Sequence, residues 1–328
     1  MRRGPILALA ACLLAAGCSS TAAPPRRPNR TPTPRGAQKR PAHFVISPAG
    51  FQLPAPVQRE VAEAVGNSIV LAGGLDSAGT STDGVFSLDP QGGHVSQLGT
   101  VPGAFHDAAG AVVGSKLVVF GGGAVVGTDH VQAFDVGARK GSFIGHLPVA
   151  LSDVSSATIG STVYLVGGYD GHTPQSAIYA TTNGTSFRRV GTMPIGLRYT
   201  AVTAVDGSVV IAGGTTGTTS VNTVNRFDPG TGHVTLLAHL PAPVAHAAAF
   251  VLGGQIYVVG GQDSEGNAVR TVMRIDPSTG GVTRLRPLAQ PVSDAGVTEL
   301  NDQAWLVGGW RGSTVSQILV ARLAHHPA

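Results

Sequence analysis

The sequence predicts an all-β protein, a β-propeller of six blades, from a repeat, its spacing and the composition. A short apolar run that ends in two glycines recurs six times among the 328 residues. Repeats of roughly 40 to 50 residues that contain four short strands are typical of propeller blades. The 46 Gly and 22 Pro, with only 12% charged residues, favour strands joined by turns over helices. The first glycines, 48, 46, 46, 47 and 48 residues apart, are Gly73, Gly121, Gly167, Gly213, Gly260 and Gly308.

Each repeat is predicted to contain four strands. The first is rich in small residues, as in residues 247–250 (AAAF), which suits the crowded strand nearest a central axis. The second is apolar on both faces, as in residues 117–120 (LVVF), so neighbouring sheets cover it on both sides. The third and fourth form an outer hairpin, with Asp-Pro or Asn-Gly supplying the turn in most repeats.

The sixth repeat lacks a fourth strand, and an N-terminal segment can supply it. After the sixth double glycine only a third strand, at residues 316–323, is predicted. The apolar segment at residues 43–53 precedes the first repeat. Joining the two ends in one blade would remove the open seam of the ring.

The double glycine that closes the second strand resembles the signature of the kelch family, over roughly residues 43–323. Most repeats lack the aromatic residues that the family often carries, and only Tyr164, Tyr257 and Trp305 occupy the usual second-strand positions. The resemblance implies a six-bladed propeller of kelch-type blades. It also implies that ligands or partners meet one face, formed by the loops before first strands and after second strands.

The N-terminus predicts an export signal. Arg2 and Arg3 precede a short apolar run, and Leu14-Ala-Ala-Gly-Cys18 resembles the bacterial lipobox. We expect a lipoprotein signal peptide at residues 1–17 and a lipidated Cys18 that holds the protein on the extracytoplasmic face of a bacterial cell membrane. An ordinary signal peptide is the alternative. Residues 18–42, rich in Pro and Arg, are expected to form a disordered tether, and residues 43–328 the propeller.

The basic charge belongs to the N-terminal region. Eight of the 22 basic residues precede residue 41, which leaves 14 against 18 acidic residues that all lie at or beyond Glu60. The propeller is therefore mildly acidic, and a nucleic-acid partner is not expected. The six basic residues of the tether should be attracted to anionic lipid head groups. We expect a monomer.

The two cysteines, Cys12 and Cys18, both precede the propeller. The propeller can therefore hold neither a disulfide nor a thiolate metal site. The Tyr-Cys crosslink of kelch-fold copper oxidases is excluded as well. No phosphate-binding loop, nucleophile elbow or H-E-x-x-H motif is present, so no cofactor, metal or catalytic residue is predicted.

Candidate binding residues follow an aligned apolar position just before each first strand. They are polar and differ between repeats, as expected of a site at the channel mouth rather than of scaffold. A channel lined by solvated polar side chains is an equally good interpretation. The candidates are Arg59, His106, Asp107, Asp153, Arg198, Tyr199, His246 and Asp294, with Trp310 and Arg311 after the last double glycine.

Other charged residues receive structural interpretations. Glu60 and Glu63 occupy first-strand positions that other repeats fill with Ala, Val, Thr or Phe. A carboxylate there could act as a general acid or base, but an ion pair with Arg59 is the favoured interpretation. His146 and His239 both precede a Leu-Pro step at matching positions, which indicates a scaffold role.

Three functions are compatible with these features. The favoured one is a membrane-tethered extracytoplasmic module that binds a protein, a glycan or a small ligand at the channel mouth. The first alternative is a sugar-modifying enzyme that resembles the sialic-acid epimerases, with Arg59, Glu60, Arg198 and Glu299 as candidates. The second alternative is a structural subunit of a cell-envelope complex. The fold alone cannot choose among them.

Overall fold

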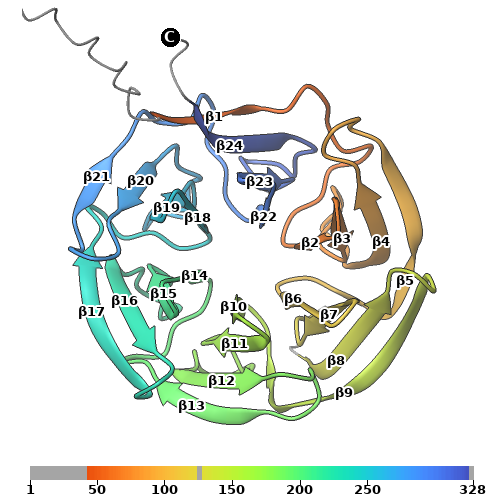
Figure 1. Ribbon diagram of the computed structural model, residues 1–328, viewed down its shortest axis with the longest axis horizontal. Coiled ribbons are helices and arrows are strands. Elements are labelled where there is room, and N and C mark those ends of the chain that lie inside the picture. Colours follow the sequence, from red (N-terminus) through yellow and green to blue (C-terminus); the bar gives the residue numbers. More distant parts are fainter. Residues whose placement is uncertain (1–42, 124–127, 325–328) are drawn as a thin grey trace, which may run out of the picture. The chain divides into compact units, whose positions relative to one another are not determined.

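A computed structural model describes residues 43–123 and 128–324 of the protein. In this part of the chain, six four-stranded antiparallel sheets surround a central channel (Figure 1). The predicted all-β, six-bladed propeller is therefore confirmed. The predicted signal peptide, Cys18 and tether lie outside the described residues. Among the described residues, no helix is long and apolar enough to cross a membrane.

In blades 1 to 5 the strands run from the channel outwards in chain order, and in blade 6 the N-terminal β1 is the outermost strand. Blade 1 contains β2 (Val61–Val65), β3 (Ser68–Ala72), β4 (Thr82–Leu88) and β5 (Val95–Phe105). Blade 2 contains β6 (Ala109–Val113), β7 (Lys116–Phe120), β8 (Thr128–Asp135) and β9 (Lys140–Leu151). Blade 3 contains β10 (Ser155–Ile159), β11 (Thr162–Val166), β12 (Ala177–Thr181) and β13 (Arg188–Thr192).

The remaining blades repeat this plan. Blade 4 contains β14 (Ala201–Val205), β15 (Ser208–Ala212), β16 (Thr223–Asp228) and β17 (His233–His239). Blade 5 contains β18 (Ala248–Leu252), β19 (Gln255–Val259), β20 (Val272–Ile275) and β21 (Val282–Arg284). Blade 6 contains β22 (Gly296–Leu300), β23 (Gln303–Val307), β24 (Ile318–Ala324) and β1 (His43–Pro48).

The N-terminal strand completes blade 6, as predicted. β1 pairs antiparallel with β24, with Phe44 opposite Leu323 and Ile46 opposite Ala321. The ring of Phe44 also stacks on Tyr257 of blade 5, with 4.4 Å between the ring centroids. The two ends of the propeller are thus held by a full strand pair and by packing against the preceding blade.

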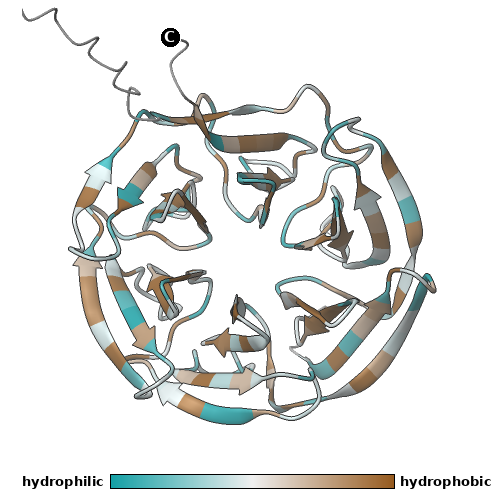
Figure 2. Cartoon of the chain, viewed as in Figure 1, coloured by the Kyte–Doolittle hydropathy of each residue, from teal (hydrophilic) through white to brown (hydrophobic). Residues whose placement is uncertain are grey.

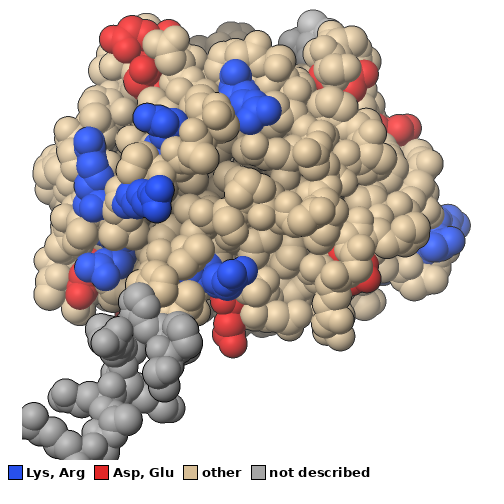
Figure 3. Space-filling view, turned by 90° about the horizontal axis from the view of Figure 1, so that it is seen from above, with Lys and Arg blue, Asp and Glu red and all other residues tan. Residues whose placement is uncertain are grey.

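The apolar core lies between the blades. The second strands are buried on both faces, and the side chains of Phe120, Phe134, Phe227 and Phe250 are fully buried. Figure 2 shows apolar residues along the inner strands and alternation on the outer strands. Burying each such side chain stabilises the fold by about 1.5–3 kcal/mol. On the side of the propeller that Figure 3 shows, uncharged residues form most of the surface, and most of the visible Lys and Arg side chains gather on the left of the view.

The double glycines join each blade to the next. At Gly213 and Gly214 the φ angles are +62° and +102°, which disfavour residues with a Cβ. The Gly214 N–H donates to the Val244 carbonyl of the following blade, at 2.8 Å, and a side chain at Gly213 would collide with the same carbonyl. Gly309 makes the equivalent bond to Val57 of blade 1, also at 2.8 Å, and so closes the ring. The repeated motif is therefore an inter-blade contact.

Candidate functional site

Six residues at one end of the channel share an uncommon backbone conformation. One comes from each blade, just before its first strand, and we call the set the mouth ring. All six have φ between 53° and 59°, the left-handed region that residues with a Cβ adopt uncommonly. They are Arg59, Asp107, Asp153, Tyr199, His246 and Asp294.

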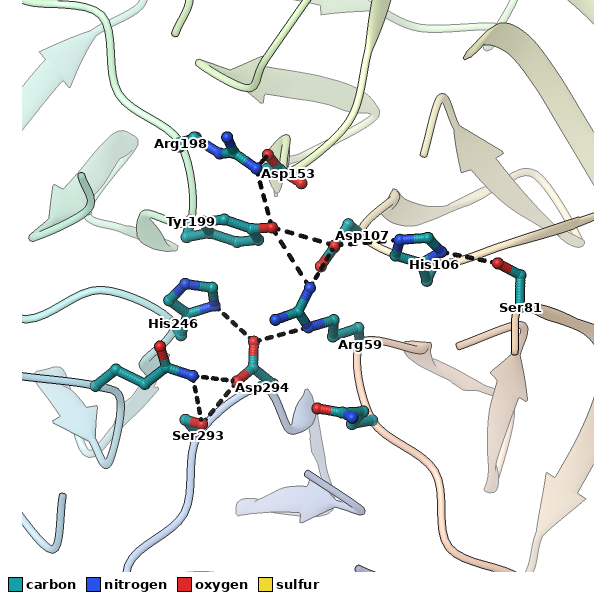
Figure 4. A network of polar contacts seen from close by, with 12 residues as sticks. Arg59, Ser81, His106, Asp107, Asp153, Arg198, Tyr199, His246, Ser293 and Asp294 are labelled. Atoms are coloured by element: carbon teal, nitrogen blue, oxygen red, sulfur yellow. Dashed lines mark hydrogen bonds and ion pairs between the residues drawn. The ribbon is translucent and has the colours of Figure 1, made fainter. Parts of the chain in front are cut away.

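A closed circle of backbone hydrogen bonds joins the mouth ring. Arg59 N–H donates to the Asp294 carbonyl at 2.8 Å, and Asp107 N–H donates to the Arg59 carbonyl at 3.2 Å. Four equivalent bonds of 2.7–3.1 Å complete the circle through the other members. Because the left-handed turn directs each N–H along the circle, one repeated backbone feature places six side chains of four types around one centre. Figure 4 shows these side chains converging from different blades.

Arg59 connects two aspartates across this centre. Its Nη1 lies 3.0 Å from Asp107 Oδ2, and its Nε lies 3.3 Å from Asp294 Oδ1. Burial disfavours the charged guanidinium, but the attraction of the two carboxylates outweighs it and holds the pKa of Arg59 above its ordinary value. The Arg59–Glu60 ion pair favoured on sequence grounds is therefore wrong. Arg59 pairs within the mouth ring, while Glu60 Oε1 accepts from the Gly296 N–H at 3.3 Å.

Asp294 has many donors. It accepts hydrogen bonds from His246 Nδ1 at 2.6 Å, from Ser293 Oγ at 2.6 Å and from Gln262 Nε2 at 2.9 Å. Burial raises the pKa of a carboxyl, but the contacts with His246, Arg59 and Ser293 outweigh it and leave the pKa of Asp294 below its ordinary value. Asp294 is therefore a stable carboxylate.

Asp107 has fewer donors and titrates near neutrality. Besides Arg59, it accepts from the Tyr199 hydroxyl at 3.3 Å, and His106 Nε2 lies 3.7 Å away. Burial raises its pKa to about 7; Arg59 opposes that rise, whereas Asp153 and Asp294 add to it. Burial and the charge of Arg59 lower the pKa of His106, whose Nδ1 shares a hydrogen bond with Ser81 Oγ at 2.9 Å.

Arg198 and Tyr199 form the aromatic side of the mouth. Arg198 pairs with Asp153, and its Nη2 donates to the Tyr199 hydroxyl at 3.1 Å. Its guanidinium also lies over the ring of Tyr169, 4.3 Å from the centroid, a cation–π geometry. The Tyr199 ring stacks on His246 with centroids 3.7 Å apart. Burial raises the pKa of Tyr199, so its hydroxyl stays neutral and donates.

The exposed groups of the site are mostly basic, and the carboxylates lie deeper. Arg59, Arg198 and His106 side chains are 24%, 23% and 18% exposed, whereas those of Asp153 and Asp294 are 2% and 3% exposed. Both arginines already contact carboxylates. The mouth therefore offers N–H donors at the surface, carboxylate acceptors beneath them and little excess charge.

Two sequence candidates lie outside this network. Trp310 is half-buried, and its backbone exchanges two hydrogen bonds with Ser293, at 2.8 and 2.9 Å. Arg311 is exposed and contacts Gln317 Oε1 at 3.3 Å. Sequence reasoning missed the roles of Tyr169 and Gln262. Both directly follow a double glycine, and that shared position is the signal that could have identified them.

A cavity of about 580 Å³ lies along the channel, lined by the first strands. Most of its lining is small, but Glu60, Glu63 and Glu299 also contribute. In the described part of the chain, Glu60 Oε2 is buried and has no hydrogen-bond partner. Burial raises the pKa of Glu60 and of Glu63 to about 8 each. Burial also raises the pKa of Glu299, whose Oε1 accepts from the Val251 N–H at 2.7 Å.

Comparison with known proteins supports the fold. The model of the Kelch motif matches residues 196–241 and 243–288, which span blades 4 and 5. No curated protein matches the chain. Among solved structures, one titled "Structure of YjhT" superposes with a TM-score of 0.73 at 15% identity, covering 82% of this chain and 96% of that one.

At that identity the likeness shows the fold alone. The double glycines, the four-stranded blades and the two matched motifs agree with one another. The chain is a six-bladed β-propeller of the kelch-repeat type.

Proposed function

We propose that the protein is a binding module that takes a small, hydroxyl-rich ligand, such as a terminal sugar of a glycan, at the mouth ring. One observation carries the proposal: the backbone of this ring repeats in all six blades, whereas its side chains are of four types, with aspartate in three blades and arginine, tyrosine and histidine in the others. A purely structural position would be expected to hold similar residues in every blade. Acidic, basic and aromatic side chains on one rigid circle instead suit recognition of an irregular polar molecule.

The chemistry of the mouth favours a neutral ligand over a strong anion. Arg59 and Arg198 both contact aspartates, so an acidic ligand would have to compete with carboxylates already in place. A hydroxyl group can accept from an arginine and donate to an aspartate at the same time. The ring of Tyr169 next to Arg198 adds an aromatic surface on which the apolar face of a sugar can lie.

We also propose that the propeller is held at the extracytoplasmic face of the membrane through Cys18, with the basic tether as a spacer. The lipobox-like residues and the charges before residue 41 support this location. Labelling with a clickable fatty acid should mark the full chain and not Cys18→Ala. Equal labelling of the two chains would contradict the anchor.

A panel of glycans and small metabolites, read by thermal shift and then by titration calorimetry, tests the binding site. We expect a neutral, hydroxyl-rich compound to bind and Arg198→Ala to weaken binding about tenfold or more, about 1.4 kcal/mol. Arg189→Ala is the matched control, because Arg189 is exposed on β13 and its side chain donates to Thr192 Oγ1 at 2.9 Å. A compound that binds Arg198→Ala and Tyr169→Ala as tightly as the parent protein would place the ligand elsewhere.

A sugar-modifying enzyme is the second candidate, and the two aspartates beside Arg59 favour it. Asp107 has a pKa of about 7, whereas the pKa of Asp294 is lowered. Two carboxyls whose environments separate their pKa values can serve as acid and base. NMR exchange spectroscopy on each bound sugar would detect interconversion of its anomers. Turnover that Asp107→Asn abolishes, with binding retained, would support catalysis. Binding without turnover would instead support a binding module that is not an enzyme.

A further inference from the structure

A cluster of metal-ligating side chains lies on the outer hairpin of blade 2, away from the mouth ring. His130 of β8 lies directly opposite His146 of β9 in the strand pair, with 5.5 Å between the ring centroids. Asp129 Oδ2 lies 3.0 Å from His146 Nδ1. One ligand atom from each of the three residues can be chosen so that all lie within 4.8 Å of one another.

The backbone explains how two consecutive residues share one side. In a regular strand, Asp129 and His130 would point to opposite faces. Here the register shifts between Thr128 and His130, so Asp129 has no partner in the strand pair. The His130 N–H donates to Thr128 Oγ1 at 3.1 Å, which holds this irregular turn. Such irregularities redirect side chains, and this one lets Asp129 and His130 both reach His146.

Blade 4 offers an internal comparison. Its His239 and Asn222 have the same sequence separation as His146 and Asp129, and His239 Nδ1 lies 3.4 Å from Asn222 Oδ1. The residue opposite His239 is Thr223 rather than histidine. Blade 4 therefore keeps the structural hydrogen bond but lacks the carboxylate and the second imidazole. The additional ligands are specific to blade 2, so the scaffold role expected for His146 does not account for them.

We propose that Asp129, His130 and His146 form a surface site for a divalent transition-metal ion of the Zn²⁺ type. Zinc binds imidazole nitrogen and carboxylate oxygen at about 2.0–2.2 Å in tetrahedral sites, which places ligand atoms roughly 3.4 Å apart. The 3.0 Å contact is within about 0.4 Å of this spacing. Closing a separation of 4.8 Å takes a combined shift of about 1.4 Å, which exposed side chains can make by rotation.

The surroundings suit a site that is open to solvent. The side chains of His146 and Asp129 are 66% and 44% exposed, so an ion can enter directly. The ring of Phe143 lies 4.8 Å from that of His130 and restricts its rotation. Three protein ligands leave a tetrahedral ion one free position. Water, or a carboxylate or imidazole of another molecule, can take that position.

Calorimetric titration of the untagged full chain with Zn²⁺ at pH 7.5 tests the site, with Co²⁺ absorption as an independent reading of tetrahedral coordination. We expect one site, weakened about tenfold or more by His130→Ala, by His146→Ala and by Asp129→Asn. His239→Ala is the matched control and should bind as the parent protein does. Binding should also weaken from pH 7.5 to pH 5.5, because protons compete for the imidazole nitrogens.

Two results would overturn this assignment. One is Zn²⁺ binding that His130→Ala and His146→Ala leave unchanged; the other is a loss that His239→Ala reproduces equally. Melting curves recorded in chelator should match for all variants, because the cluster is exposed and contributes little to folding without metal. Neither outcome depends on the mouth ring, so the metal site and the proposed binding function stand or fall separately.

Discussion

The mouth ring and the channel wall both bury carboxyl groups, yet the pKa of Asp294 at the mouth and those of the channel glutamates are shifted in opposite directions. At the mouth, Asp294 has Arg59, His246 and Ser293 as partners, and its pKa is lowered. In the channel, burial raises the pKa of Glu60 and of Glu63 to about 8 each. Asp107 lies between these cases, because Arg59 opposes the effect of burial and the pKa still rises to about 7. Burial alone therefore does not decide the charge of a carboxyl in this protein, and the pKa falls below its ordinary value where several donors and cations act together, as at Asp294.

The two regions also differ in what they contribute. The channel wall consists mainly of small residues that let the inner strands approach, and its neutral glutamates fit that packing. The mouth ring concentrates charge on a strained backbone, with each left-handed residue costing on the order of 1–2 kcal/mol. Hydrogen bonds and ion pairs among the six members offset this cost. The comparison predicts that removing a partner at the mouth destabilises the fold, whereas replacing the ionisable carboxyls of the channel by amides stabilises it at high pH.

The largest effect is expected from Arg59→Ala. It would leave Asp107 and Asp294 buried without their shared cation, and we expect a loss of about 4 kcal/mol in the free energy of unfolding at pH 8. The loss should shrink at pH 5, because the unpaired carboxyls then take up protons. Urea denaturation at both pH values measures it. Arg189→Ala, at an exposed position, should change stability by less than about 0.5 kcal/mol. A loss below about 1 kcal/mol for Arg59→Ala would contradict the pairing described here.

The next effect concerns the channel glutamates and has the opposite sign. A carboxyl with a pKa of about 8 when folded and about 4.3 when unfolded binds more protons in the folded state between these values. The stability it contributes is therefore complete below about pH 4 and is lost as the pH rises towards 8. Glu60→Gln with Glu63→Gln should match the parent protein most closely at pH 4. At pH 8 the free energy of unfolding of the double variant should exceed that of the parent protein by about 2 kcal/mol. We expect no larger difference, because water in the channel partly solvates the ionised carboxyls.

Urea denaturation from pH 4 to pH 9 measures this difference in slope. Glu265→Gln is the control, because Glu265 is exposed, and it should leave the pH dependence unchanged. Parallel stability curves for the double variant and the parent protein would show that the channel carboxyls are ionised at neutral pH.

The smallest effect is expected from Tyr199→Phe. The variant loses the hydroxyl that donates to Asp107 and accepts from Arg198, but it keeps the ring stacked on His246. We expect a loss of about 1 kcal/mol, seen as a lower melting temperature. Tyr169→Phe should change stability less, since the ring beneath Arg198 remains. Equal losses in the two variants would mean that the Tyr199 hydroxyl contributes nothing specific to the network.

Much of the fold could be predicted because the chain repeats it. The six double glycines established the number of blades, and the unpaired third strand of the last repeat predicted that residues 43–53 would return to it. β1 does pair with β24, although the strand ends at Pro48, five residues before the end of the segment expected to form it. Aligning the repeats also identified every member of the mouth ring, because an equivalent position in each repeat must lie at an equivalent place in the ring.

The alignment could not say which of those side chains contact each other. Arg59 was expected to pair with its neighbour Glu60, but it pairs with Asp107 and Asp294. Similarly, the repeat pattern does not bring Asp129 and His130 to the same side of blade 2, since a strand normally separates consecutive side chains onto opposite faces. In both places a local departure from regular backbone geometry decides the direction of a side chain.

The sequence by itself thus determined the propeller, its closure and the positions that face the channel mouth, because a repeat can be read directly from the order of residues along the chain. Only the tertiary structure decided the partners of Arg59, the protonation of the channel glutamates and the convergence of the blade 2 ligands. These depend on distances between blades and on left-handed or irregular turns. A repeat pattern does not record either of them.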